Sequence, residues 1–271
     1  MEAADRELVA ALCAARAGLR VDPDRAYLIE SRLAPVARRE GFGSLDQFVE
    51  TVRVRGDERL VWALVEAMAP PETSFFRDPA VFEVIVREVL PGLVRGAGGA
   101  PVRIWSAACG TGQEVYSLAM RIAEEPGLAG RVEIFASDLS ERSLEKAQAG
   151  LYSQFEVQRG LPARRLVRHF EKRGDLFALS PQVRQMVRWR RVNLLDDLSR
   201  LGRFELILCR NVLSSLTGEA REQVMGALAG LLAPGGRLVL GRSEAAQAWL
   251  DPVAAEVGVF ELASDAARSA A

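Results

Sequence analysis

Two glycines, Gly110 and Gly112, are the residues of this chain best suited to bring a backbone close to a ligand. They lie in the run Trp105-Ser-Ala-Ala-Cys-Gly-Thr-Gly-Gln-Glu-Val-Tyr-Ser117, between a short apolar stretch and a helix-like segment. Without a Cβ atom, glycine lets the backbone bend sharply and approach a ligand closely. A turn of this kind at the carboxyl end of a parallel strand is where open α/β sheets bind their cofactors.

The same turn lacks the residues that read a pyrophosphate. It has no third glycine of the dinucleotide fingerprint, and it has no Gly-Lys-Ser or Gly-Lys-Thr of a phosphate loop. A nucleoside ligand without phosphates is therefore favoured, and S-adenosylmethionine is the common one.

Two carboxylates are placed to bind such a ligand. Asp138 ends the next predicted strand, where a carboxylate accepts hydrogen bonds from both ribose hydroxyls of a nucleotide. The alternative role of Asp138, capping the following helix, is less favoured because Ser140 can do the same. Glu114 begins the helix after the glycine turn; it either provides favourable charge at a helix N-terminus or binds the polar end of the ligand.

Polar residues from two other segments are expected near the same edge of the sheet. Arg210 and Asn211 follow an apolar strand directly. Arg77 stands beside Phe75 and Phe76, just after the helical front part of the chain. The two aromatic residues are either core between domains or neighbours of an arginine that clamps a carboxylate.

The elements that must position these residues alternate along the chain. Residues 1–70 have the apolar spacing of helices, and residues 79–95 predict one further helix. Strand and helix then alternate, which predicts a largely parallel sheet covered by helices. Residues 151–192 interrupt the alternation and predict a small antiparallel insertion plus one sheet strand. The expected strands are 102–106, 132–137, 204–209 and 237–240, and the expected helices are 114–123, 140–149 and 220–232.

Composition excludes several other classes of protein. A chain of 271 residues with 49% apolar residues can fill a real core, and a net charge of −1 gives no global attraction to nucleic acid or to anionic membranes. Three separated cysteines and the single histidine, His169, argue against a metal site. We expect a cytoplasmic protein with no signal peptide, no metal and no membrane-spanning segment.

Six ordered blocks of this sequence resemble the chemotaxis receptor methyltransferases of the CheR type. Residues 72–78, Glu-Thr-Ser-Phe-Phe-Arg-Asp, are similar to the family signature Glu-Thr-x-Phe-Phe-Arg-Asp. Residues 105–117 resemble the family's Trp-Ser-Ala-x-x-x-Thr-Gly-Glu-Glu-Pro-Tyr-Ser. The other similar blocks, in order, are Phe135-Ala-Ser-Asp-Leu-Ser140, Val192-Asn-Leu-Leu195 with Cys209-Arg-Asn-Val212, and Gly241-Arg-Ser-Glu244.

The resemblance implies an α/β protein that methylates glutamate side chains on the cytoplasmic helices of chemoreceptors. Its fold would be a Rossmann-like class I methyltransferase sheet, with an N-terminal all-α domain at 1–72 and a methyltransferase domain at 73–271. A small antiparallel β insertion at about 151–190 would help some members grip receptors. S-adenosylmethionine would be the donor and S-adenosylhomocysteine the product. By this resemblance Arg77 is also the catalytic candidate, and the cofactor site comprises Thr73, Arg77, Glu114, Asp138, Asn193, Leu194, Arg210 and Asn211.

The chain departs from the family pattern at a few positions. Ser215 stands where a tyrosine facing the reaction centre is usual, Pro71 replaces an asparagine, and Arg242 replaces a histidine. In the front domain, Pro35 and Val36 occupy positions that are often basic. Two alternatives therefore stay open: a cofactor-binding signalling module with weak or no activity, and a carboxyl methyltransferase of a non-receptor substrate.

Overall fold

The chain forms two compact units in a computed structural model that describes residues 1–69 and 73–263. One unit comprises Met1–Pro70, Asn193–Leu195 and Ser215–Met225, and the other comprises Pro71–Val192, Asp196–Ser214 and Gly226–Ala271. Pro71, Glu72 and the alanine-rich tail lie outside the described residues. The predicted domain boundary at residues 72 and 73 falls beside that gap and stays a prediction.

Helices form the N-terminal unit, as the apolar spacing predicts. Ser44 caps one of them by accepting a hydrogen bond from the Gln47 amide, and Asp57 caps another at the Arg59 and Leu60 amides. The second helix continues through Pro35, where a kink is expected from the sequence. Within residues 1–69 the helices are α1 (Ala3–Ala17), α2 (Ala26–Arg39), α3 (Leu45–Arg55) and α4 (Glu58–Met68).

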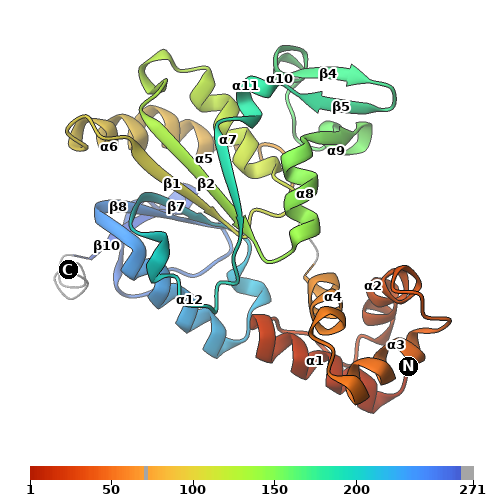
Figure 1. Ribbon diagram of the computed structural model, residues 1–271. Helices are drawn as coiled ribbons and strands as arrows, with labels where there is room; N and C mark the ends of the chain where they lie inside the picture. Colours follow the sequence, from red (N-terminus) through yellow and green to blue (C-terminus); the bar gives the residue numbers. More distant parts are fainter. Residues whose placement is uncertain (70–72, 264–271) are drawn as a thin grey trace. The chain divides into compact units, whose positions relative to one another are not determined.

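A mostly parallel sheet is the centre of the second unit (Figure 1). Its described strands are β1 (Val102–Ala107), β2 (Val132–Asp138), β6 (Val187–Arg191), β7 (Phe204–Cys209), β8 (Leu232–Leu240), β9 (Leu250–Ala254) and β10 (Val259–Leu262). The strand order is β6-β2-β1-β7-β8-β10-β9, and only β10 and β9 run antiparallel to their neighbours. The predicted fold class is confirmed, whereas the sequence patterns do not predict the β9–β10 pair.

A helix follows each of the parallel strands β1, β2 and β7 along the chain, and the carboxyl ends of these strands lie at one edge of the sheet. The helix α7 (Gln113–Ala123) follows β1, α8 (Glu141–Ala149) follows β2, and α12 (Gly218–Leu231) follows β7. Buried side chains of β1 and β7, Ile104, Trp105 and Leu206 among them, make the sheet core. Because these strands are parallel, the residues that follow β1, β2 and β7 lie at the same edge of the sheet.

The helix expected over residues 79–95 is interrupted by a π-helical turn. It consists of α5 (Pro79–Val84), the π segment η1 (Ile85–Val89) and α6 (Leu90–Gly96). Pro91 has no amide hydrogen, so the regular i to i−4 hydrogen bond is missing there. Just before this proline, the Leu90 amide donates a hydrogen bond to the Ile85 carbonyl, five residues earlier, which is the wider i to i−5 spacing of a π turn.

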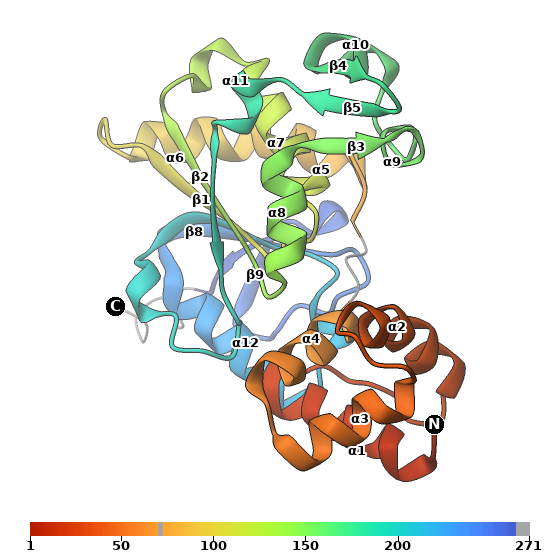
Figure 2. The same ribbon diagram turned by 45° about the vertical axis from the view of Figure 1, so that its right-hand side comes forward.

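The predicted insertion is a three-stranded antiparallel sheet with short helices (Figure 2). Its strands are β3 (Leu151–Ser153), β4 (Phe170–Arg173) and β5 (Leu176–Leu179), in the order β3-β5-β4, and its helices are α9 (Gln154–Gln158), α10 (Ala163–His169) and α11 (Pro181–Arg184). The chain then enters the large sheet as β6, parallel to β2. Both parts of the expectation for residues 151–192 are confirmed.

Glu124, directly after α7, joins the insertion to α7. Its carboxylate accepts hydrogen bonds from Arg165 Nη2 at 2.9 Å and from Arg121 Nη1 at 3.0 Å, and it lies 3.3 Å from His169 Nε2. Burial acts to raise the pKa of Glu124. The hydrogen bonds from Arg165, His169 and Arg121 outweigh burial and lower the pKa to about 2.

We expect this cluster to make the protein sensitive to acid. A depressed carboxyl pKa adds stability that is present above the usual value of 4.5 and is lost as the pH falls through about 2. Burial also lowers the pKa of His169, with Glu124 opposing it, so protonation of His169 favours the unfolded chain. Both groups make the free energy of unfolding fall with falling pH.

The measurement is urea unfolding of the wild type and of Glu124→Gln at a series of pH values. The midpoint of the variant should fall less steeply below about pH 4.5 than that of the wild type. The exposed Glu133, changed to Gln, is the control and should keep the wild-type slope. Equal slopes for Glu124→Gln and the wild type would contradict the assignment.

The described part of the chain contains no helix that is long and apolar enough to cross a bilayer.

Candidate functional site

The glycine turn after β1 has the conformation that the sequence predicts. Gly110 has φ 57° and Gly112 has φ 90°, both in the left-handed region that glycine enters without steric cost. Gly112 is the N-cap residue of α7, so the α7 amide groups open toward this turn. The Tyr152 hydroxyl of β3 donates a hydrogen bond to the Thr111 carbonyl at 2.8 Å and fixes the turn from the insertion.

Asp138, at the end of β2, holds the glycine turn from the other side. Its Oδ2 accepts a hydrogen bond from the Gly110 amide at 2.8 Å, and its Oδ1 accepts one from the Ser140 amide at 2.9 Å. Burial raises the pKa of Asp138, while the amides of Ser140, Gly110 and Leu139 oppose the rise. Ser140, and not Asp138, is the N-cap of α8. Each carboxylate oxygen keeps a lone pair for a ribose hydroxyl.

Replacing Asp138 with alanine should weaken binding of S-adenosylhomocysteine by about 1–3 kcal/mol, because hydrogen bonds to the ribose and to the Gly110 amide are lost. Titration calorimetry of the purified variant measures this directly. The control is Glu133→Ala, an exposed carboxylate on the same strand, which should bind like the wild type. An unchanged affinity in Asp138→Ala would show that the ribose lies elsewhere.

Arg210 forms a buried ion cluster with Glu114 and Asp78, which come from two other segments of the chain. It follows β7, and its side chain has no exposed surface. Its Nη1 lies 2.5 Å from Glu114 Oε2, and its Nη2 lies 2.7 Å from Asp78 Oδ2. The Arg77 carbonyl accepts a further hydrogen bond from Nη1 at 3.4 Å. The sequence suggests that Glu114 acts at a helix N-terminus or binds the ligand, and neither role includes the ion pair with Arg210.

The electrostatics of the cluster centre on Glu114. Burial raises the pKa of Glu114, and the charges and hydrogen bond of Arg210, together with the charge of Arg77, offset part of that rise. Arg210 pairs directly with both carboxylates, and the charge of Arg77 adds to the compensation of Glu114. Such a group can fix the shape of a site without adding a strong net charge.

Residues 73–78 form an irregular, strained segment. Phe76 has φ 47° and Asp78 has φ 54°, values that non-glycine residues rarely adopt. The Phe76 amide donates a hydrogen bond to Ser117 Oγ at 2.8 Å, which ties the segment to α7. Strained backbone of this kind persists where the surrounding structure determines it, often at functional sites.

Thr73 supplies the clearest sign of a ligand. Its Oγ1 is buried and has no hydrogen-bond partner among the residues that the structure describes. Buried hydroxyls are normally paired, and leaving one unpaired costs about 1–3 kcal/mol. Arg210 Nε is in the same situation within the described part of the chain. The Nε atoms of Arg131, Arg184 and Arg221, which lie outside this site, are unpaired in the same way among the described residues. The hydroxyl of Thr73 is therefore the atom that fits a site completed by a bound ligand.

Glu244 is a residue of this region that the sequence patterns do not single out as part of the site. Its carboxylate accepts hydrogen bonds from the amides of Asn211, Leu213 and Gly241 at 2.9, 2.7 and 2.7 Å. Asn211 has φ 61°, so Glu244 stabilises a strained turn directly after Arg210. In the sequence, the Gly241-Arg-Ser-Glu244 block stands out only by its resemblance to the family pattern, and the carboxylate in that block is the signal that could have indicated the role of Glu244.

Asn193 and Leu194 belong to the N-terminal unit, whereas the other predicted site residues belong to the second unit. Asn193 Nδ2 donates a hydrogen bond to the Arg16 carbonyl at 2.7 Å, and its Oδ1 accepts one from the Leu195 amide at 3.2 Å. Ser215 is in the N-terminal unit as well, where its carbonyl accepts a hydrogen bond from the Arg20 amide. The cofactor role of Asn193 and Leu194 stays a prediction.

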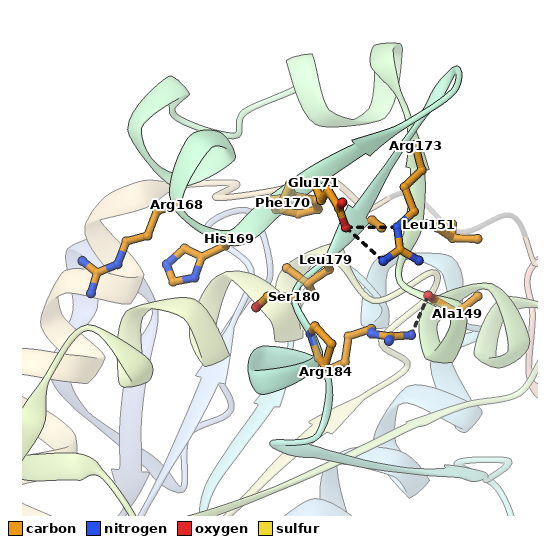
Figure 3. Close-up of a pocket in the computed structure, with 12 residues that line it drawn as sticks. Ala149, Leu151, Arg168, His169, Phe170, Glu171, Arg173, Leu179, Ser180 and Arg184 are labelled. Atoms are coloured by element: carbon orange, nitrogen blue, oxygen red, sulfur yellow. Dashed lines mark hydrogen bonds and ion pairs between the residues drawn. The ribbon is translucent and has the colours of Figure 1, made fainter.

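A cavity of about 370 Å³ lies on the insertion (Figure 3). Arg168, Arg173 and Arg184 give its wall a basic character, and Glu171 pairs with Arg173. None of the predicted cofactor residues lines it, so this cavity is distinct from the proposed donor site. In the described residues, no cluster of histidine, cysteine, aspartate or glutamate has the arrangement of a metal site.

The parallel sheet, the glycine turn after β1 and the acidic end of β2 define the class as that of S-adenosylmethionine-dependent methyltransferases with a class I fold. Residues 71–256 match the family described as "CheR methyltransferase, SAM binding domain". The chain belongs to this family of CheR-type protein-glutamate methyltransferases.

Full-length relatives agree with this assignment. The chain is 40% identical over 249 residues to "Chemotaxis protein methyltransferase 1" of Pseudomonas aeruginosa, covering 89% of this chain and 90% of that protein. It is 36% identical to "Chemotaxis protein methyltransferase Cher2" of Pseudomonas putida, covering 84% and 85%. It is 38% identical to "Chemotaxis protein methyltransferase 1" of Vibrio cholerae, covering 84% of each chain. The predicted family, activity and cofactor are confirmed.

Proposed function

We propose that this chain transfers the methyl group of S-adenosylmethionine to glutamate side chains on the cytoplasmic helices of a chemoreceptor. The observation that carries the proposal is the family match over residues 71–256. Arg210, Glu114 and Asp78, which form the buried ion cluster, all lie within the matched residues. A receptor substrate of this kind requires the protein to act in the cytoplasm.

The residues at the sheet edge suit binding of an adenosyl amino acid. Asp138 would accept hydrogen bonds from the ribose hydroxyls, and the Thr73 hydroxyl would regain a partner. Arg210, with Glu114 and Asp78, would hold the wall of the site rigid. Asn211 completes the proposed set of cofactor residues in this unit, and a cofactor role of Asn193 and Leu194 stays a prediction from the family resemblance.

The reaction needs no strong base. A glutamate side chain has an ordinary pKa of about 4.3, so the nucleophile is ionised at neutral pH. The cofactor, when bound, supplies an activated methyl group. The protein must align the substrate carboxylate with that group and exclude water. In this proposal Arg77 orients the substrate carboxylate, at some cost to the nucleophilicity of that carboxylate.

Arg77→Ala should reduce methyl transfer far more than cofactor binding, because a misplaced nucleophile costs about 100-fold in rate. The rate is measured with labelled S-adenosylmethionine and a receptor fragment, and affinity is measured by calorimetry with S-adenosylhomocysteine. The exposed Arg95 of α6, changed to alanine, serves as the control. Equal losses of rate and affinity would mean that Arg77 only binds the cofactor.

The substrate is tested by mass spectrometry and base treatment. Receptor peptides should gain about 14 Da in the presence of the protein, and the label should be released by base as methanol. Base-stable label would exclude a carboxyl ester. Binding of the cofactor without transfer to any cognate receptor would favour the signalling module that the serine at position 215 suggests. Base-labile transfer to another protein alone would favour a non-receptor substrate.

A further inference from the structure

The insertion packs directly against residues 75 and 76, which precede Arg77. The ring centroid of Phe75 lies 5.0 Å from that of Tyr152 in β3 and 5.7 Å from that of Phe170 in β4. Both pairs have the edge-to-face geometry that aromatic rings favour. Phe75 is fully buried, so the two rings of the insertion form part of its environment.

Backbone packing adds a second contact. Gly160 lies between α9 and α10, and a Cβ at this position would come within 2.0 Å of the Phe75 carbonyl oxygen. Only glycine permits this approach, because the nearest atom is backbone and has no rotamer by which to move away. The insertion and the strained segment 73–78 are therefore fitted to each other at atomic contact.

Arg165 provides the third contact, and it acts on Phe76. Its guanidinium carbon lies 4.5 Å from the centroid of the Phe76 ring, a cation–π arrangement. Glu124 holds the guanidinium by hydrogen bonds to Nε at 3.0 Å and to Nη2 at 2.9 Å. The planar group is thereby fixed in orientation, with one edge on a carboxylate and one face on a ring.

The contact between Arg165 and Phe76 lies at a residue with strained backbone. Phe76 is in the left-handed region, and its amide donates to Ser117 Oγ on α7. A strained residue persists when the surrounding structure determines its conformation. The Phe76 ring is contacted by Arg165 on the insertion and by Phe82 of α5, whose ring centroid lies 5.5 Å away, and Ser117 holds the amide. Arg77 follows Phe76 directly, so its backbone direction depends on these contacts.

We propose that Arg165 is a positioning residue for methyl transfer: from the insertion, it fixes Phe76 and thereby the direction of Arg77. The insertion is then a structural part of the reaction site as well as a separate small sheet. This inference rests on the proposed role of Arg77 in orienting the substrate carboxylate. Arg165 does not touch the reacting groups, so it acts on rate through geometry and leaves the cofactor contacts of Asp138 in place.

The test compares Arg165→Met, which keeps the length of the side chain without its charge, with Arg165→Lys, which keeps the charge without the planar group. Arg164→Ala, an exposed arginine on the same helix, is the matched control. We expect Arg165→Met to lower kcat per folded molecule at least about tenfold, since small misplacements near the nucleophile are costly. Affinity for S-adenosylhomocysteine should fall by a clearly smaller factor than kcat, because Asp138 and the glycine turn keep their places, and Arg165→Lys should recover part of kcat.

Hydrogen–deuterium exchange gives a readout that does not depend on turnover. The amides of residues 73–78 should exchange faster in Arg165→Met than in the wild type, while those of β1 keep their rates. Unchanged exchange in residues 73–78, or faster exchange throughout the sheet, would overturn the proposal, as would a kcat and a cofactor affinity that fall by the same factor. If the wild type transfers no methyl group, the proposed function fails, and the exchange result alone decides the role of Arg165.

Discussion

Arg210→Ala should be among the most damaging single substitutions in this protein. It removes the fully buried cation that pairs with both Glu114 and Asp78 and leaves the mostly buried Glu114 carboxylate and the partly exposed Asp78 carboxylate without that partner. Removing one partner of a buried ion pair costs about 3–5 kcal/mol, because the remaining charge stays desolvated and uncompensated. We expect the free energy of unfolding to fall by that amount at neutral pH, and the affinity for S-adenosylhomocysteine to fall at least about tenfold.

The loss of unfolding free energy in Arg210→Ala should depend on pH. Burial already raises the pKa of Glu114, and removing Arg210 takes away the main opposing charge, so the pKa rises further in the variant. A carboxyl whose pKa is raised on folding contributes stability at low pH that is lost as the pH rises through the folded-state pKa. Urea unfolding should therefore show a smaller difference between variant and wild type at about pH 5 than at about pH 8.

A surface arginine provides the comparison. Arg237 pairs with Glu261 at 2.8 Å, and both side chains are partly exposed. Arg237→Ala should change stability by less than about 1 kcal/mol, since exposed ion pairs contribute little. If Arg210→Ala were as mild as Arg237→Ala, the buried cluster would not be a stabilising centre of the site.

Gly112→Ala should have the second large effect. A Cβ at Gly112 would lie 2.9 Å from Ala147 Cβ and 3.2 Å from both Trp189 Cη2 and the Tyr152 hydroxyl. The residue also has φ 90°, which strains any side chain. Left-handed backbone costs about 1–2 kcal/mol and overpacking about 1–3 kcal/mol, so we expect a loss of about 2–5 kcal/mol and weaker cofactor binding.

Substitutions at two other glycines separate the backbone cost from the packing cost. Gly130 has φ 70°, and a Cβ at this position would meet open space within 4 Å, so Gly130→Ala should show the backbone cost alone. Gly127 has open space and no positive φ, so Gly127→Ala should be close to neutral. Thermal and urea unfolding of the three variants should rank them in the order Gly112, Gly130, Gly127. A Gly112→Ala variant no less stable than Gly130→Ala would refute the steric account.

Local signals make much of the fold predictable from sequence. The glycine turn, the alternation of strands and helices, and the break at residues 151–192 are all patterns within short windows. The position of Asp138 at the end of β2 is predictable too, because a polar residue after an apolar strand marks the strand end. The antiparallel β9–β10 pair escapes prediction, since Pro252 and a short strand give little periodic signal.

Side-chain partners are predictable only in part. Arg210 lies 96 residues from Glu114 and 132 residues from Asp78, so no local pattern joins them. The network of Glu124, Arg165 and His169 likewise depends on how the insertion folds back on α7. From the sequence, His169 serves only as an argument against metal binding. Such pairings follow from tertiary structure, which periodicity and spacing do not encode.

We propose that the glycine turn, Asp138 and residues 73–78 form an adenosyl-binding site at the edge of the sheet. Calorimetric titration of the purified wild type with S-adenosylhomocysteine is the direct test. We expect saturable binding at one site per chain, with a dissociation constant between about 1 μM and 1 mM, and weaker binding in Asp138→Ala. No heat of binding at millimolar concentrations, for either this product or S-adenosylmethionine, would contradict it.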